Sequence, residues 1–163
     1  MTDEITLRSE LKPGDIGRII TLHGEGYEQE DGEFGLTFEA HVARTAAEFI
    51  LDNGARGRVW LAERGRDLVG CAAMVDRSDR GQLRWIIVSP AARGCGLGDR
   101  LISAAMAYAE ECGFREVFLE TTPGLDTSMR IYEKLGFKII KEEFLPLWTK
   151  EPLAVQVMAK KLK

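Results

Sequence analysis

The most informative stretch of this chain is LRWIIVSPAARGCGLGDRL, residues Leu83 to Leu101. Its apolar run from Trp85 to Val88 has the length and the β-branched content of a strand that is buried on both faces. Ser89 and Pro90 end that strand, because proline has no N–H for the ladder and restricts the residue before it. A glycine-rich turn follows and leads directly into a helical pattern, so the stretch predicts strand, turn and helix in succession.

The turn has three glycines that alternate with other residues, at positions 94, 96 and 98. Without Cβ atoms, several of its N–H groups can point at one anion beside the positive end of a helix dipole. The turn therefore predicts a cradle for a phosphate-bearing ligand. A P-loop is excluded because no Gly-Lys-Ser/Thr follows, and a dinucleotide fold is excluded because Asp99 stands where a third glycine is required.

Two motifs resemble those of the GNAT superfamily, the acyl-CoA-dependent N-acetyltransferases. Residues 93–98 match Arg-x-x-Gly-x-Gly, its pyrophosphate-binding signature, and residues 131–137, IYEKLGF, resemble its short helix with a tyrosine and a closing Gly-Phe. The matches cover roughly residues 83–141. The resemblance implies an α/β fold, in which helices flank a mixed, mostly antiparallel central sheet with a splayed parallel pair in its middle.

Hydrophobic periodicity along the chain fits this fold. Strands are predicted at residues 4–8, 59–63, 68–75, 83–88, 116–121, 137–144 and 153–161, and helices at 15–27, 36–51, 97–112 and 125–135. Residues 28–35 are expected to form an acidic loop. Strand, helix and strand over residues 83–121 require a right-handed crossover and a parallel strand pair. No internal repeat or linker interrupts the pattern, so residues 1–163 are expected to form one domain.

Composition excludes several classes of protein. Hydrophobic residues make up 45% and charged residues 29% of the 163 residues, and the net charge is −4, which argues against nucleic acid as the main partner. No apolar run is long enough to cross a bilayer, and residues 1–4 lack the features of a signal peptide. The three cysteines are odd in number and widely spaced, so they predict neither a disulfide framework nor a metal site. We expect a cytoplasmic location, with no metal and no membrane partner.

The resemblance also implies acetyl-CoA as cosubstrate, held where the central strands separate. A splayed strand needs partners for its free N–H and C=O groups, which an amide-bearing ligand supplies. The residues implied to bind it are Ile86, Ile87 and Val88 for pantetheine, Arg93, Gly94, Cys95, Gly96, Leu97 and Gly98 for the pyrophosphate, and Thr122, Asp126 and Ser128 for further contacts. The last three are also placed where polar residues serve as helix caps.

Transfer is expected to be direct, with an amine attacking the thioester while both substrates are bound. Tyr132 matches the tyrosine that protonates the leaving thiolate, a suitable role because phenols and thiols have similar pKa values; the alternative is a core tyrosine. The amine must lose a proton before it attacks. Glu120, at the end of a central strand, and Glu30, in the acidic loop, are the candidate bases.

His23, Tyr27, Glu30 and Phe34 are the predicted acceptor-binding residues. Their segment also resembles one in GNAT domains that are often joined to winged-helix regulators, although Asp31 and Glu33 replace an aromatic pair here. The predicted acceptor is an amine of a small molecule or a peptide, and a late strand is a candidate for pairing across a homodimer. A non-catalytic acyl-CoA sensor or interaction module and a nucleotide-binding protein are the alternative functions.

Overall fold

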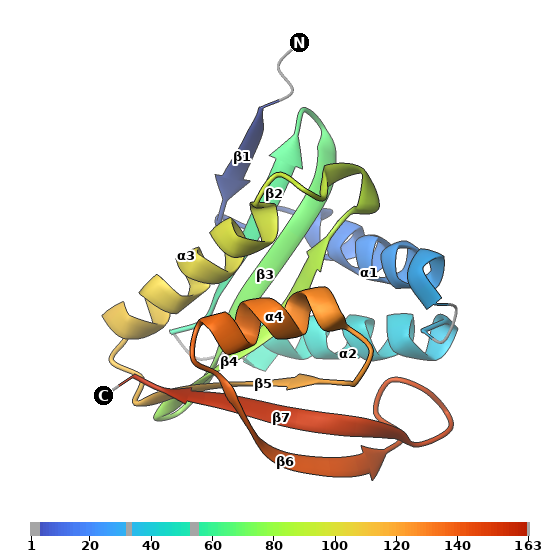
Figure 1. The fold of residues 1–163 in the computed structure, drawn as a ribbon. Helices are drawn as coiled ribbons and strands as arrows, with labels where there is room; N and C mark the ends of the chain where they lie inside the picture. Colours follow the sequence, from blue (N-terminus) through green and yellow to red (C-terminus); the bar gives the residue numbers. More distant parts are fainter. Residues whose placement is uncertain (1–3, 32–33, 53–55, 163) are drawn as a thin grey trace.

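The computed structural model describes residues 4–31, 34–52 and 56–162, the side chains of residues 27–31 excepted (Figure 1). Within these residues a seven-stranded sheet is covered by helices on both faces. The elements are β1 (Ile5–Arg8), α1 (Asp15–Asp31), α2 (Leu36–Asp52), β2 (Arg58–Arg64), β3 (Asp67–Arg77), β4 (Arg80–Val88), the 3₁₀ turn η1 (Pro90–Ala92), α3 (Leu97–Glu111), β5 (Glu116–Thr121), α4 (Asp126–Lys134), β6 (Lys138–Leu145) and β7 (Leu153–Lys161).

The strand order is β1-β2-β3-β4-β5-β7-β6, and every neighbouring pair is antiparallel except β4 and β5. The parallel pairing of β4 with β5 begins at Arg80 opposite Glu116 and ends at Gln82 opposite Phe118. Beyond that point β4 runs on to Val88 without pairing to β5, so the middle of the sheet is open on one edge of β4. The predicted mixed sheet with a splayed parallel pair is confirmed.

A β-bulge lies where the two strands begin to separate. On β3, Cys71 is opposite Ile87 and Ala73 is opposite Arg84, so two residues of β4 face one residue of β3. Trp85 has a φ of 48°, which is unusual for a residue other than glycine. The bulge gives two consecutive side chains, Arg84 and Trp85, contacts with the same helix, α2.

The prediction that residues 85–88 are buried on both faces is correct only for alternate positions. Trp85 and Ile87 are buried against α1 and α2, whereas Ile86 and Val88 are half-buried. The difference follows from the separation of β4 from β5, which leaves one side of the strand end exposed to a hollow.

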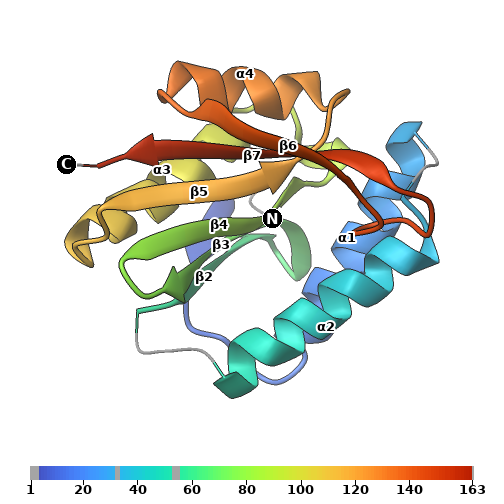
Figure 2. The ribbon, with the colours of Figure 1, turned by 90° about the horizontal axis from the view of Figure 1, so that it is seen from below.

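Two hydrophobic cores hold the layers together. One packs α3 and α4 on one face of the sheet, with Leu101, Leu119 and Met158 almost fully buried. The other packs α1 and α2 on the opposite face, around Ile19 and Leu61. Figure 2 shows these helix pairs on opposite sides of the strands. No helix among the described residues is both long and apolar enough to cross a membrane.

Most predicted elements appear within a few residues of their expected bounds, and the first helix is the main exception. It continues to Asp31, so residues 28–31, predicted as the start of an acidic loop, are helical. Glutamate and glutamine are good helix formers, and their charge alone does not end a helix. The sequence Asn53-Gly54 predicts a stop for the second helix, because glycine is common just after a helix end, but these two residues lie outside the described part of the chain.

Candidate active site

The end of β4, the glycine turn and the start of α4 enclose a groove of about 520 Å³. Most residues predicted to bind the cofactor line this groove: Ile86, Ile87, Val88, Arg93, Gly94, Gly96, Leu97, Gly98, Asp126 and Ser128. The structure therefore brings together residues from three separate parts of the chain around one elongated hollow.

The glycine turn is built to bind an anion. Gly94 and Gly96 have φ values of 82° and 78°, a left-handed conformation that L side chains rarely adopt. Among the described backbone hydrogen bonds, none uses the N–H groups of residues 94–99 as donors. These groups lie at the N-terminus of α3, where the helix dipole favours negative charge. The guanidinium of Arg93 lies beside the turn, with Nε 3.2 Å from the carbonyl oxygen of Val88, to which it donates.

Two of the residues assigned to the cofactor by resemblance are placed differently. Cys95 is exposed and does not line the groove; its thiol donates to the carbonyl oxygen of Ala92 at 3.1 Å. Thr122 is buried, and its hydroxyl donates to the carbonyl oxygen of Ala154 at 2.8 Å, which ties the end of β5 to β7. Thr122 lines a second hollow instead of the groove.

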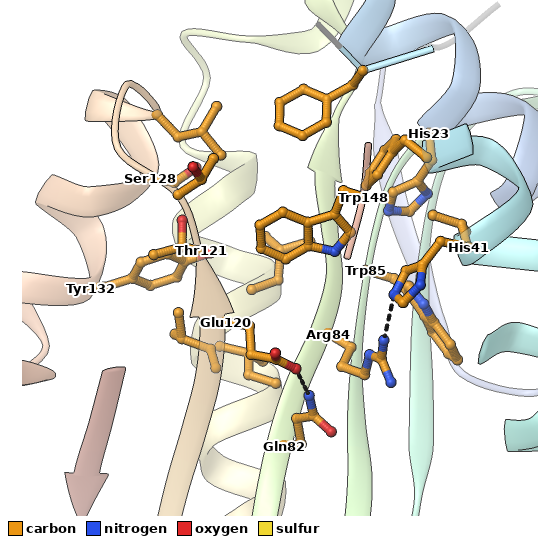
Figure 3. A pocket seen from close by; sticks show the side chains of 18 residues that line it. His23, His41, Gln82, Arg84, Trp85, Glu120, Thr121, Ser128, Tyr132 and Trp148 are labelled. Carbon is orange, nitrogen blue, oxygen red and sulfur yellow. Dashed lines mark hydrogen bonds between the residues drawn. The ribbon is translucent and has the colours of Figure 1, made fainter. Parts of the chain in front are cut away.

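The second hollow has a volume of about 100 Å³ and lies between β4, β5, α2 and α4 (Figure 3). Ile86, Leu125 and Ser128 line both this hollow and the groove. The two spaces are therefore neighbours and share part of their wall where β4 and β5 have separated.

Both described candidates for proton transfer line the second hollow. Glu120 projects from β5, and its carboxylate accepts a hydrogen bond from Nε2 of Gln82 at 3.1 Å. Tyr132 projects from α4 and is 6% exposed, with its ring packed edge-on to Phe137 at 6.1 Å between centroids. Figure 3 shows Glu120 and Tyr132 on the same wall of the hollow. The structure thus places a carboxylate and a phenol at one end of it.

Two of the residues predicted to bind the acceptor, His23 and Phe34, also line the second hollow. His23 is buried, and its Nδ1 donates to the carbonyl oxygen of Ile19 at 2.9 Å, so Nε2 is an acceptor. Burial lowers the pKa of His23 to about 4, and the ring is neutral at physiological pH. Phe34 is 2% exposed and packs against Trp148, with 6.4 Å between ring centroids. Tyr27 and Glu30 lie in the last turns of α1, and their side chains are outside the described part of the molecule.

Sequence reasoning missed Arg84, His41 and Trp148, which also line the second hollow. Burial, with the positive charges of Arg84 and Arg44, lowers the pKa of His41 to about 4. The available signal was the single arginine directly before the apolar run of β4. Strand alternation does not show where its side chain points, because the bulge changes which face each residue occupies.

The described residues contain no group of three or more histidine, cysteine, aspartate and glutamate side chains placed to hold a metal ion. The groove is lined by the acidic residues Asp99 and Asp126 and, at the glycine turn, by backbone N–H donors and an arginine. Such donors suit phosphate oxygens.

Known proteins with these features are found by sequence and by structure. The model of the acetyltransferase (GNAT) family matches residues 25–137. The uncharacterized N-acetyltransferase YjgM of Escherichia coli is 34% identical over 122 residues, which cover 69% of this chain and 72% of that protein. N-acetyltransferase 8F1 of Rattus norvegicus is 31% identical over 100 residues, 58% of this chain but only 45% of that longer protein.

Solved structures share the fold at lower identity. A GNAT-family acetyltransferase from Staphylococcus aureus has a TM-score of 0.79 at 16% identity, covering 98% of this chain and 100% of that one. The putative acetyltransferase yncA of Salmonella typhimurium, solved with its cofactor acetyl-CoA, has a TM-score of 0.71 at 19% identity, covering 98% and 94%. With the splayed parallel strands, the glycine turn and the family match in agreement, this chain belongs to the GNAT acetyltransferase family.

Proposed function

We propose that this protein transfers an acetyl group from acetyl-CoA to a primary amine by direct attack in a ternary complex. The observation that carries the proposal is the wall that the groove and the second hollow share at Ile86, Leu125 and Ser128. Two ligands held in these neighbouring spaces would have their reacting ends close together, and positioning of this kind contributes much of the rate of a two-substrate reaction. The N-acetyltransferase names of its relatives and the acetyl-CoA in the Salmonella structure support the choice of reaction.

The groove is the proposed cofactor site. Backbone N–H groups of residues 94–99 and the guanidinium of Arg93 would hold the pyrophosphate, and the edge of β4 that has separated from β5, from Ile86 to Val88, would meet the pantetheine amides. The bound cosubstrate supplies the acetyl thioester. The backbone N–H of Val88 is the proposed donor to the thioester carbonyl oxygen.

The second hollow is the proposed acceptor site. Glu120 would accept the proton that the amine loses, directly or through a water molecule. Tyr132 would donate its phenolic proton to the departing sulfur. His23 and Phe34 would contact the acceptor from the α1 and α2 side, and Tyr27 and Glu30 remain predicted contacts.

The test is a survey of primary amines with the purified protein and acetyl-CoA, read by thiol release and by mass measurement of the product. We expect acetyl-CoA to raise the melting temperature and at least one class of amine to be acetylated. Thermal protection by acetyl-CoA without transfer to any amine would favour the acyl-CoA sensor. Stronger protection by ATP or NAD than by acetyl-CoA would favour a nucleotide-binding protein.

A further inference from the structure

Arg84 supplies a positive charge to the second hollow. Its half-buried side chain extends from β4 toward α2, where Nη2 lies 3.4 Å from Nε2 of His41 (Figure 3). Among the described residues Arg84 forms no ion pair with a carboxylate, although Glu120 and Glu48 are near enough to favour its charged form. Burial lowers the pKa of Arg84 from its ordinary value, yet a guanidinium stays protonated at neutral pH.

The other basic groups of the hollow carry no charge at neutral pH. Burial holds the pKa values of His23 and His41 at about 4. A neutral imidazole accepts one hydrogen bond but does not neutralise a cation. Among the described residues lining the hollow, Arg84 is therefore the one cation at neutral pH, and Glu120 is the one acidic residue. Since Arg84 forms no ion pair with a carboxylate among the described residues, its guanidinium would stabilise an anion that entered the hollow.

The two charges come from the two strands that separate. Arg84 projects from β4 toward α2, and Glu120 projects from β5 beside Tyr132, as Figure 3 shows. Phe34, Trp148 and Phe38 add aromatic surface around the hollow, with 5.1 Å between the ring centroids of Phe34 and Phe38. With a volume of about 100 Å³, the space suits a short polar head group better than a bulky one.

We propose that the acceptor is a small amine that carries a carboxylate close to the amino group, as an apolar α-amino acid does. The guanidinium of Arg84 binds the carboxylate through paired N–H donors, and Glu120 faces the amino group at the reacting end. The aromatic side chains contact the apolar part of the acceptor. This inference rests on the proposed N-acetyltransferase activity and selects, within it, free amino acids over the N-termini of peptides, whose α-carboxyl group is an amide.

The test compares three forms of one acceptor: L-phenylalanine, L-phenylalaninamide and phenethylamine. A second series uses L-leucine, L-leucinamide and 3-methylbutylamine, so that the result does not depend on one side chain. With acetyl-CoA saturating, we expect kcat/KM for each amino acid to exceed that for its amide and its decarboxylated amine by about 10- to 100-fold, as charge-assisted hydrogen bonds indicate.

The variant Arg84→Gln separates carboxylate binding from a structural role. We expect it to lower kcat/KM for the amino acids by about 10- to 100-fold, mainly through KM, and to change the amides and decarboxylated amines by less than threefold. Arg84→Lys should recover part of the loss. Arg80→Gln is the matched control, because Arg80 lies on the same strand, outside both hollows, and pairs with Glu116 at 3.7 Å.

The possible outcomes distinguish this inference from the function on which it rests. If acetyl-CoA binds but no amine of the wider survey is acetylated, the proposed N-acetyltransferase activity is wrong, and the inference fails with it. If amines are acetylated without a preference for the carboxylate, or if Arg84→Gln slows all three forms equally, the carboxylate assignment alone is wrong. A preference for 1-amino-2-phenylethylphosphonate over L-phenylalanine would also overturn it.

Discussion

In the proposed transfer, the hydroxyl of Tyr132 donates its proton to the departing sulfur. In Tyr132→Phe the proton donor is lost while the ring and its packing on Phe137 are kept. We expect kcat to fall by about 100-fold or more, the usual contribution of a placed acid, with the Kd for acetyl-CoA unchanged. Steady-state kinetics and calorimetric titration with acetyl-CoA measure the two quantities.

Tyr108 provides the matched control for that substitution. It is 9% exposed, packs on Trp60 at 5.5 Å between ring centroids and lines neither hollow. Burial raises its pKa to about 12. Tyr108→Phe should leave kcat within about twofold of the original, and a wild-type kcat in Tyr132→Phe would show that Tyr132 is only a core residue.

Glu120 is the proposed proton acceptor, and Glu120→Gln removes its charge while keeping a group that can bond to Gln82. We expect kcat at neutral pH to fall by about 100-fold. Part of the activity should return as pH rises, since the free amine then loses its proton in solution. Glu116→Gln, on the same strand and outside both hollows, should behave as wild type. Equal losses in both variants would contradict the assignment.

At the residue scale the sequence predicts the cofactor side better than the acceptor side. The roles of Gly94 and Gly96 in the turn can be predicted from the sequence, because a left-handed backbone favours glycine whatever the rest of the fold is. Arg84 and His41 line the second hollow only because of the bulge and the packing of α2 on β4. No local pattern records that packing, so these two residues were found only in the structure.

Substitutions in the glycine turn give the most direct test of the proposed cofactor site. Gly98 has space for a methyl group, because an added Cβ atom would lie 3.7 Å from Cδ1 of Ile131 and 3.9 Å from Cγ2 of Val88. Gly98→Ala should therefore fold with unchanged stability. The added methyl group enters the wall of the groove, so we expect the Kd for acetyl-CoA, measured by calorimetry, to rise about tenfold or more.

Gly94→Ala is the companion variant. A Cβ atom added at Gly94 would have no other atom within 4 Å, but the positive φ of this residue disfavours alanine. At a φ of 82° an alanine is strained by about 1 to 2 kcal/mol, which chemical denaturation would detect as lost stability. The pair separates a steric effect on the ligand from a conformational effect on the turn. Unchanged acetyl-CoA affinity in Gly98→Ala would argue against the groove as the cofactor site.

Helices and strands were predictable where the hydrophobic periodicity and the helix- or strand-breaking residues indicate the same bounds. The strands at residues 116–121 and 153–161 have the bounds expected from alternation alone. The predicted end of α1 was wrong because the last residues of this helix are acidic. Their charge suggests a solvent-exposed loop, whereas glutamate and glutamine favour a helix by propensity. The bulge in β4 was not predictable, since Trp85 is not a residue that positive φ favours.

The whole molecule should lose stability as pH falls, in a window set by its buried histidines. His23 and His41 have folded-state pKa values of about 4 against 6.5 for an ordinary histidine. Between pH 6.5 and 4 the unfolded chain therefore binds protons that the folded chain does not, so stability present above pH 6.5 is lost as pH decreases. For His23 alone we expect about 2 kcal/mol of loss by pH 4.5.

The measurement is the free energy of unfolding by urea at pH 7.5 and at pH 4.5, for the wild type and for His23→Leu. The variant should show a smaller difference between the two pH values, because one buried base is gone. Asp15, whose pKa is held at about 2, mainly by Arg8, loses its contribution only as pH falls below about 3.8 and does not interfere. The same pH difference in both proteins would exclude His23 as a cause.

At this largest scale the mixed, mostly antiparallel sheet and its splayed parallel pair were predictable, but only through the resemblance carried by two short motifs. Hydrophobic periodicity alone predicts strands and helices, but it does not predict which of them lie next to one another in the fold. The second hollow was not predictable, because it is assembled from α1, α2, α4, two strands and the loop that holds Trp148.

The shared wall of the two hollows has a consequence for the proposed reaction. Ile86, Leu125 and Ser128 line both the groove and the second hollow. A substitution at any of these three positions would alter both proposed binding sites at once. Its effects on acetyl-CoA and on the amine would therefore be correlated.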